Sequence, residues 1–225
     1  MILPKESATF SSCRFNFFRT ILIPNSRVDA SFANTNDYIN AGAMNPNNGS
    51  ALGKFQSAMQ IRRSSRLSCI NSVAVGFPIG LIIDGEKGNS PAMATAGNLK
   101  LQNVWLADMD ILGSDANKTY NDAFVTGFDE NKKPILDESR ESFSSSFFKA
   151  QPGNHIASAN ELALTGKNVL KGLSASFMPS ANSPLLSGAS FAGFTGFDNV
   201  SFIGAFGTDN WLSGWTNFDP ENTIY

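Results

Sequence analysis

The chain has 225 residues, of which 42% are hydrophobic and 16% charged, and its formal net charge is −2. This length permits one domain with a sizeable core, and the near-neutral charge provides no general attraction to nucleic acid. No apolar run approaches the roughly 20 residues that a membrane-spanning helix needs, so no transmembrane segment is predicted.

The first elements in chain order are a strand and a long polar segment. Residues 10–17 alternate as a strand does, and residues 25–55 are rich in Asn, Gly, Ala and Ser, a composition typical of loops. Arg62, Arg63 and Arg66 then form a basic cluster. A solvated edge is favoured over a polyanion site as the role of this cluster.

The cysteines and the histidine exclude the commonest metal sites. Cys13 and Cys69 are too few for a disulfide framework. Both lie in apolar-patterned segments, which favours buried free thiols, while a disulfide between them stays open. The sequence has a single histidine, His155, and no CxxC motif, so we expect no metal site of these types.

Four segments share one pattern, in which an apolar residue comes first, a small polar residue third, and alternating apolar residues follow. They are residues 10–17, 69–76, 101–108 and 197–204, with Ser12, Asn71, Asn103 and Asn199 in third place. Asn tolerates left-handed backbone and bonds to nearby backbone groups, so it can turn a corner between strands, and equivalent Asn residues can stack. The pattern predicts an all-β protein of the parallel β-solenoid type, in which each coil packs against its neighbours.

Residues 64–85 fit one nearly complete coil, made of a strand, an Asn corner, a second strand, a Gly–Phe–Pro turn, a third strand and an Asp–Gly turn. The four copies are unequally spaced, so extra loops are expected. Residues 114–160 are predicted to form an inserted loop and helix. The helix is predicted over residues 134–150, because Pro134 suits a first turn and Phe143 and Phe147 lie four apart.

Two stretches then resemble a known family. Residues 64–113 are similar in part, and residues 178–220 more closely, to the C-terminal half of Bacteroidetes-type secreted right-handed parallel β-helix proteins, a largely uncharacterised family. The first motif consists of Pro179, Ser183, Pro184 and Gly188. The second consists of Gly204, Ala205, Phe206, Trp211, Gly214, Trp215, Phe218, Asp219 and Pro220.

The resemblance implies a right-handed parallel β-helix over residues 1–225, incomplete at its N-terminal end, with a C-terminal cap at residues 205–225. It also implies an extracellular or outer-membrane surface location. The chain begins without an export signal and ends at Tyr225 without the sorting tail that members often carry. We therefore expect a partial chain whose export signal is missing.

The best candidates for chemistry are Asp108 and Asp110. On a strand, residues two apart point to the same side roughly 7 Å from each other, which suits a pair of catalytic carboxylates or a Ca²⁺ site. Ordinary solvent-facing acids are the favoured interpretation. Arg62 and Arg63 complete a polyuronate site only if they stack beside Asp84 or Asp108. The polar loop at residues 115–122 is a second, weaker Ca²⁺ candidate.

Trp211 and Trp215 lie close together near the end of the chain. Two roles stay open for them, a platform that stacks on sugar rings and a cap over the last coil, and the cap is favoured because a solenoid needs its end covered.

The sequence predicts a non-catalytic secreted or cell-surface β-solenoid used in adhesion, envelope structure or glycan binding. Its expected partner is a polysaccharide or cell-envelope glycan rather than nucleic acid. The alternative is a polysaccharide lyase or glycoside hydrolase that acts on an outward sheet face through Asp108 and Asp110.

Overall fold

The computed structural model describes residues 56–164, 178–210 and 214. In chain order it contains β1 (Ser57–Ile61), β2 (Ser68–Val75), β3 (Ile79–Ile83), α3 (Ser90–Thr95), β4 (Lys100–Ala107), β5 (Ile111–Ser114), β6 (Phe124–Phe128), β7 (Pro134–Asp137), α4 (Phe143–Ala150), β8 (His155–Ala157) and the 3₁₀ helix η5 (Pro184–Leu186). The predictions for residues 10–17, Cys13, Trp211, Trp215 and most of residues 205–225 lie outside the described residues.

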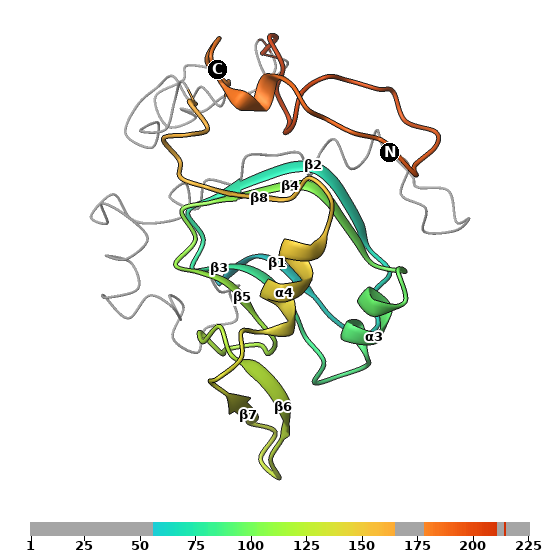
Figure 1. Cartoon of the computed structure of the whole chain (residues 1–225), viewed down its shortest axis with the longest axis vertical. Helices are drawn as coiled ribbons and strands as arrows, with labels where there is room; N and C mark the ends of the chain where they lie inside the picture. The colour runs from blue at the N-terminus through green and yellow to red at the C-terminus, as the bar shows by residue number, and fades with distance from the viewer. Residues whose placement is uncertain (1–55, 165–177, 211–213, 215–225) are drawn as a thin grey trace, which may run out of the picture.

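The strands form two parallel sheets and one antiparallel hairpin. β1, β3 and β5 make one three-stranded sheet, and β2, β4 and β8 make the other. β6 and β7 pair with each other in the antiparallel sense. Figure 1 shows the two parallel sheets as stacked layers, with α4 beside them and the β6–β7 hairpin projecting at one end. Residues 178–210 lie over the outer side of the β2–β4–β8 layer (Figure 1).

The core follows from this layering. One cluster of buried side chains fills the space between the two sheets and receives Phe148 from α4; its largest members are Ile61, Leu81, Ile83, Leu99, Leu101, Leu106 and Phe148. A second cluster covers the outer face of the β2–β4–β8 sheet and consists of Val73, Ala107, Leu162, Leu164, Leu185, Ile203 and Phe206. The sheet is therefore buried on both faces, which stabilises the fold by about 1.5–3 kcal/mol for each large side chain that is fully buried.

The prediction of an all-β, right-handed parallel β-helix is wrong. The described residues form three small sheets of mixed direction together with two α-helices. Between β5 and β8 the chain makes an antiparallel hairpin and a helix, not further parallel strands. Residues 197–204, the fourth copy of the pattern, form no strand. There Gly204 has a left-handed φ of 96° and the Ile203 amide donates to the Leu185 carbonyl at 2.7 Å.

The helix predicted over residues 134–150 is also wrong in extent. Its first part is β7, which pairs with β6, and only Phe143–Ala150 is helical. Asp137 ends the strand in a turn, since its carboxylate accepts hydrogen bonds from the Ser139 amide and hydroxyl. Ser142 then caps the helix by accepting from the Ser145 amide at 3.0 Å. The end of the strand at Asp137 and the cap of the helix at Ser142 are separate local features, and the prediction of one helix over residues 134–150 took both segments as one.

The Asn corner is confirmed at two copies of the pattern. Residues 69–76 and 101–108 correspond to β2 and β4, and Asn71 and Asn103 have left-handed φ values of 48° and 52°. The Asn103 Nδ2 donates to the Asn71 Oδ1 at 3.1 Å. Both side chains are buried. Their amides therefore join adjacent strands at the corner.

The same two amides also hold the C-terminal segment on the sheet. Asn71 donates to the Ser190 carbonyl at 3.0 Å and accepts from the Ser190 amide at 2.9 Å. Asn103 donates to the Gly188 carbonyl at 3.1 Å. The Asn71 carbonyl accepts from the Gly204 amide. Residues 188–190 thus receive from this pair the backbone hydrogen bonds that a strand would otherwise supply.

Cys69 is buried and free, and its burial raises the pKa of the thiol, so it acts as a small apolar side chain.

Within the described ranges, no helix combines the length and apolar character that crossing a membrane requires. The predicted domain bounds stay predictions.

We expect Asn71→Ala to lower the free energy of unfolding by about 2–4 kcal/mol. The change leaves buried partners of the amide unsatisfied and puts alanine in a left-handed conformation. Urea denaturation measures the loss. Asn199→Ala is the matched control, because Asn199 holds the same pattern position but is exposed, and it should change stability by no more than about 0.5 kcal/mol. Equal effects of the two substitutions contradict the corner assignment.

A second pair of variants tests how closely the backbone approaches this corner. Gly153 and Gly97 have nearly equal φ values, +71° and +72°, but a Cβ on Gly153 meets the Asn103 Oδ1 at 1.6 Å while one on Gly97 meets nothing within 4 Å. We expect Gly97→Ala to cost about 1–2 kcal/mol and Gly153→Ala to cost a further ~2 kcal/mol by thermal or chemical denaturation. Equal losses contradict the close approach.

Candidate functional site

Asp108 and Asp110 lie in the turn between β4 and β5, and both are exposed. Asp108 has a left-handed φ of 49°. Because both residues follow β4 instead of lying in it, the strand geometry that points alternate side chains the same way does not apply to them. Partial burial raises the pKa of Asp110. The structure places both carboxylates on the surface, and neither residue lines the two pockets described below.

A pocket of about 310 Å³ lies between the β6–β7 hairpin, the loop before α3 and the start of α4. Its lining residues are Gly85, Gly88, Asn89, Pro91, Asp115, Phe124, Val125, Thr126, Gly127, Phe128 and Phe143. Three phenylalanines from two elements thus line one space, together with Asn89 and Thr126. A mainly apolar surface with a few polar groups is the usual make-up of a small-ligand site.

The carboxylate of Asp115 builds the inner wall of this pocket. Asp115 is buried. Its two oxygens accept hydrogen bonds from the amides of Val125, Phe143 and Ser144 at 3.2, 2.9 and 2.9 Å, and from the Ser144 hydroxyl at 2.9 Å. One side chain therefore fixes the start of α4 and the β6 strand to the end of β5. With four donors on it, this carboxylate is occupied in a structural role.

A second carboxylate completes the helix start. Asp122 accepts from the amide and hydroxyl of Ser142 at 3.0 and 2.6 Å and from the Ser145 hydroxyl at 2.7 Å. The two aspartates are the ends of the loop predicted as a weak Ca²⁺ candidate. Both carboxylates face the N–H and O–H donors of α4, and negative charge is favourable at a helix N-terminus. The described contacts therefore account for both acids without a cation.

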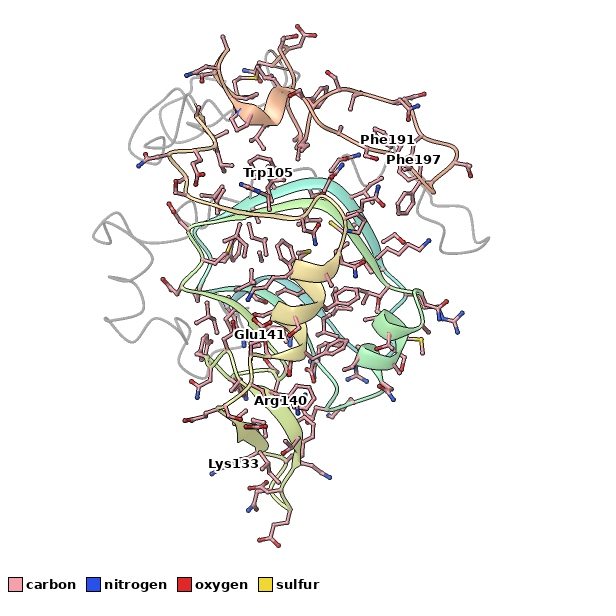
Figure 2. All side chains as sticks on the ribbon, in the orientation of Figure 1. Trp105, Lys133, Arg140, Glu141, Phe191 and Phe197 are labelled. Carbon is pink, nitrogen blue, oxygen red and sulfur yellow. The ribbon has the colours of Figure 1, made fainter. Side chains whose placement is uncertain are left out.

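The segment between β7 and α4 is held against β6 by a cation over an aromatic ring. The Arg140 guanidinium lies 3.8 Å from the centroid of the Phe124 ring, and its NH1 lies 4.0 Å from Asp137. Figure 2 shows Arg140 and the neighbouring Glu141 between the hairpin and α4. Phe143, at the other side of the pocket, stacks on Phe147 with centroids 5.9 Å apart. The pocket rings are thus positioned by contacts outside the pocket.

The Arg62 side chain lies beside Asp84, as one of the sequence alternatives required. Arg62 Nε is 2.8 Å from the Asp84 Oδ2, although the two atoms are not aligned as a hydrogen bond, and its NH2 is 3.9 Å from Glu86. Asp84 is fully buried. The pair neutralises a buried acid at the end of β3. The ion pair therefore stabilises the loop between β3 and α3, which forms one wall of the pocket.

Two further surface features are formed mainly by residues 186–209. A hollow of about 460 Å³ is lined by residues of 186–209, including Val200, Phe202 and Asp209. In the loop at residues 187–200, Phe197 lies 5.6 Å from Phe191 and 5.9 Å from Phe194 between ring centroids. The Lys100 ammonium lies 5.4 Å from the Phe194 ring, and Figure 2 shows Phe191 and Phe197 side by side on this loop. Neither feature places an aromatic wall opposite another across a pocket.

Across the described residues, no three His, Cys, Asp or Glu side chains come together in a way that fits a metal ion. His155 lies in β8 against Trp105, with ring centroids 4.3 Å apart. Trp211 and Trp215, the predicted sugar platform or cap, lie outside the described residues.

The aromatic pocket was missed from the sequence. Its walls come from residues 85–91, 124–128 and 143, which the sequence assigned to a turn, a loop and a helix. The sequence feature that could have indicated an aromatic pocket was the spacing of Phe124 and Phe128 beside the acid-rich loop. This spacing gives no indication that the loop before α3 lies next to these two residues.

Comparison of the chain with protein-family models, with curated proteins and with solved structures finds no match. The resemblance to the Bacteroidetes-type proteins is thereby neither supported nor refuted, and it stays a prediction.

We expect Asp115→Asn to lower the free energy of unfolding by about 2–4 kcal/mol, because the new amide group turns N–H donors toward the donors that the carboxylate accepts. Denaturation and amide hydrogen exchange at Phe143 and Ser144 measure the loss. Asp108→Asn, on the exposed turn, is the control and should cost no more than about 0.5 kcal/mol. Stability unchanged by Asp115→Asn contradicts the role assigned to this carboxylate.

Proposed function

We propose that this chain is a non-catalytic glycan-binding protein, secreted or displayed at the cell surface, and that its ligand occupies the pocket lined by Phe124, Phe128 and Phe143. The observation that carries the proposal is the presence of three phenylalanines among the residues that line one open pocket of about 310 Å³. The carboxylate in that pocket, Asp115, is occupied by four hydrogen bonds and so is poorly suited to proton transfer.

The pocket chemistry suits a sugar ring. Aromatic rings present flat apolar faces, and a pyranose has a face of C–H groups that packs well on such surfaces. Asn89 and Thr126 line the same pocket. The Asn89 Oδ1 accepts from the Ala92 amide and the Thr126 hydroxyl donates to the Ile135 carbonyl, which leaves the Asn89 NH2 group as a donor and the Thr126 oxygen as an acceptor for sugar hydroxyls. This combination of apolar faces and a few polar groups supports glycan binding more than binding of a wholly apolar ligand.

The surface location rests on composition. Charged residues make up only 16% of the chain. Small neutral polar residues supply much of the remaining polarity, as in many extracellular proteins. The alternative function, a polysaccharide lyase or glycoside hydrolase that uses Asp108 and Asp110, has weaker support, because these two exposed residues lie outside the aromatic pocket.

A glycan array probed with the full chain tests the proposal. For a glycan that binds, we expect Phe128→Ala to weaken affinity roughly 10- to 100-fold, since one buried aromatic contact contributes about 1.5–3 kcal/mol. Ile135→Ala is the matched control, because Ile135 lies on the facing strand of the same hairpin, is 49% exposed and does not line the pocket. Its affinity should stay within twofold of the parent chain.

A reducing-sugar release assay on the same glycans separates the two functions. Binding without release supports the proposal. Release that Asp108→Asn abolishes establishes the enzyme instead, and glycan binding that Phe128→Ala leaves unchanged removes the pocket as the site.

A further inference from the structure

The wall of the pocket that precedes α3 carries cationic side chains. Gly88 and Asn89 line the pocket, and Lys87, the residue before them, is exposed. Because Lys87 is bonded directly to a lining residue, its flexible side chain starts at the rim of the pocket.

The turn after β1 brings the backbone of a second cationic residue, Arg63, to the same rim. A Cβ on Gly88 would lie 2.9 Å from the Arg63 Cα, which places the backbone of Arg63 against the pocket wall. The Asn89 amide donates to the Ser64 hydroxyl at 2.8 Å, and the Ser64 amide donates to the Ser90 hydroxyl at 3.3 Å. The turn that carries Arg63 is therefore fixed to the loop that carries Lys87.

The backbone of this turn disfavours the residues that occupy it. Arg63 and Ser64 have consecutive left-handed φ values of 56° and 58°. Glycine and asparagine are the usual residues at such paired positions, because a Cβ is unfavourable there. Left-handed backbone costs free energy at a non-glycine residue and occurs at some ligand-binding sites. It also occurs at other described residues, such as Lys118, Lys132 and Ala163, so it supports a role for the Arg63 side chain only together with the exposed position of that residue beside the pocket.

The local charges leave Arg63 and Lys87 available. Arg62 pairs with the buried Asp84 and lies 3.9 Å from Glu86, so the acids of this loop already have a cationic partner. In the part of the chain that the structure describes, Arg63 and Lys87 form no ion pair, and both are exposed. Arg63 and Lys87 thus place two cationic groups, without an ion-pair partner among the described residues, beside the aromatic pocket, whose inner wall holds the hydrogen-bonded carboxylate of Asp115.

We propose that the ligand of the pocket is a polyuronate, a polysaccharide whose sugar rings carry carboxylates, and that Arg63 and Lys87 bind those carboxylates. The inference rests on the proposed function and specifies its ligand. The guanidinium of Arg63 matches a carboxylate with two parallel hydrogen bonds, while Lys87 acts as a mobile point charge. The rings of Phe124, Phe128 and Phe143 receive the sugar faces.

Binding of the full chain to two polyuronates, polygalacturonate and polymannuronate, tests the proposal. The probe for charge is the fully methyl-esterified form of each polymer, which keeps the sugar rings and removes the negative charge. We expect at least one acidic polymer to bind at least tenfold more tightly than its ester, and its affinity to fall as NaCl is raised from 50 to 500 mM.

Two variants locate the charge effect. The single variant Lys87→Gln should weaken binding of the acidic polymer about threefold. The double variant, Arg63→Gln with Lys87→Gln, should weaken it at least tenfold. Both variants should leave the affinity for the ester within twofold of that of the parent chain. Lys133→Gln is the control of equal charge change, since Lys133 lies on the hairpin away from α3 and the loop before it (Figure 2). Circular dichroism and a melting curve verify that each variant is folded, and the single Lys87→Gln change serves if the double variant is not.

If the acidic polymers and their esters bind with equal affinity, and Phe128→Ala abolishes the binding of both, the polyuronate inference is wrong and the proposed function stands. Failure of every polymer to bind overturns the inference as well, while the glycan array decides the proposed function separately. Single-stranded DNA that binds as tightly as polyuronate, with the same loss in the double variant, shows a general polyanion surface and also overturns it.

Discussion

The buried carboxylate of Asp115 is the interaction on which the candidate site depends. It accepts hydrogen bonds from the amides of Val125, Phe143 and Ser144 and from the Ser144 hydroxyl. A buried carboxylate is costly unless it is bonded in this way, and each of these donors would otherwise be unsatisfied. The carboxylate and the donors therefore require each other. Because they come from the end of β5, from β6 and from the start of α4, their association also positions the pocket walls.

Asn71 and Asn103 play the corresponding part in the sheets. Their left-handed backbone turns each strand at the same place, and the hydrogen bond between their side chains joins β2 to β4. The remaining donors and acceptors of the pair bind residues 188–190. The outer face of the sheet thereby receives the C-terminal segment, while α4 and the hairpin on the other side remain available to form a site.

The local structure was more predictable than the fold. The Asn-third pattern located β2 and β4 because Asn has a strong backbone preference that acts within a few residues. The same pattern failed at residues 197–204, where the Ile203 amide donates to Leu185 and no parallel strand is formed. The prediction of a parallel β-helix was wrong because it extended a local pattern to the pairing of strands that are distant in sequence. Which distant segments pair is decided by long-range contacts such as the hydrogen bonds of Asp115, and these leave no local pattern in the sequence. The pocket depends on three segments distant in sequence, so no single stretch indicated it.

The central claim is that an acidic glycan binds between the hairpin, the loop before α3 and α4. The most direct measurement is the ¹H–¹⁵N NMR spectrum of the full chain titrated with a short oligouronate that corresponds to whichever polymer binds. We expect saturable shifts at the amides of Lys87, Gly88, Phe128 and Phe143, residues that line or adjoin the pocket. Shifts confined to the turn of Asp108 and Asp110 or to the loop of Phe191 and Phe197, with the pocket amides unchanged, contradict it.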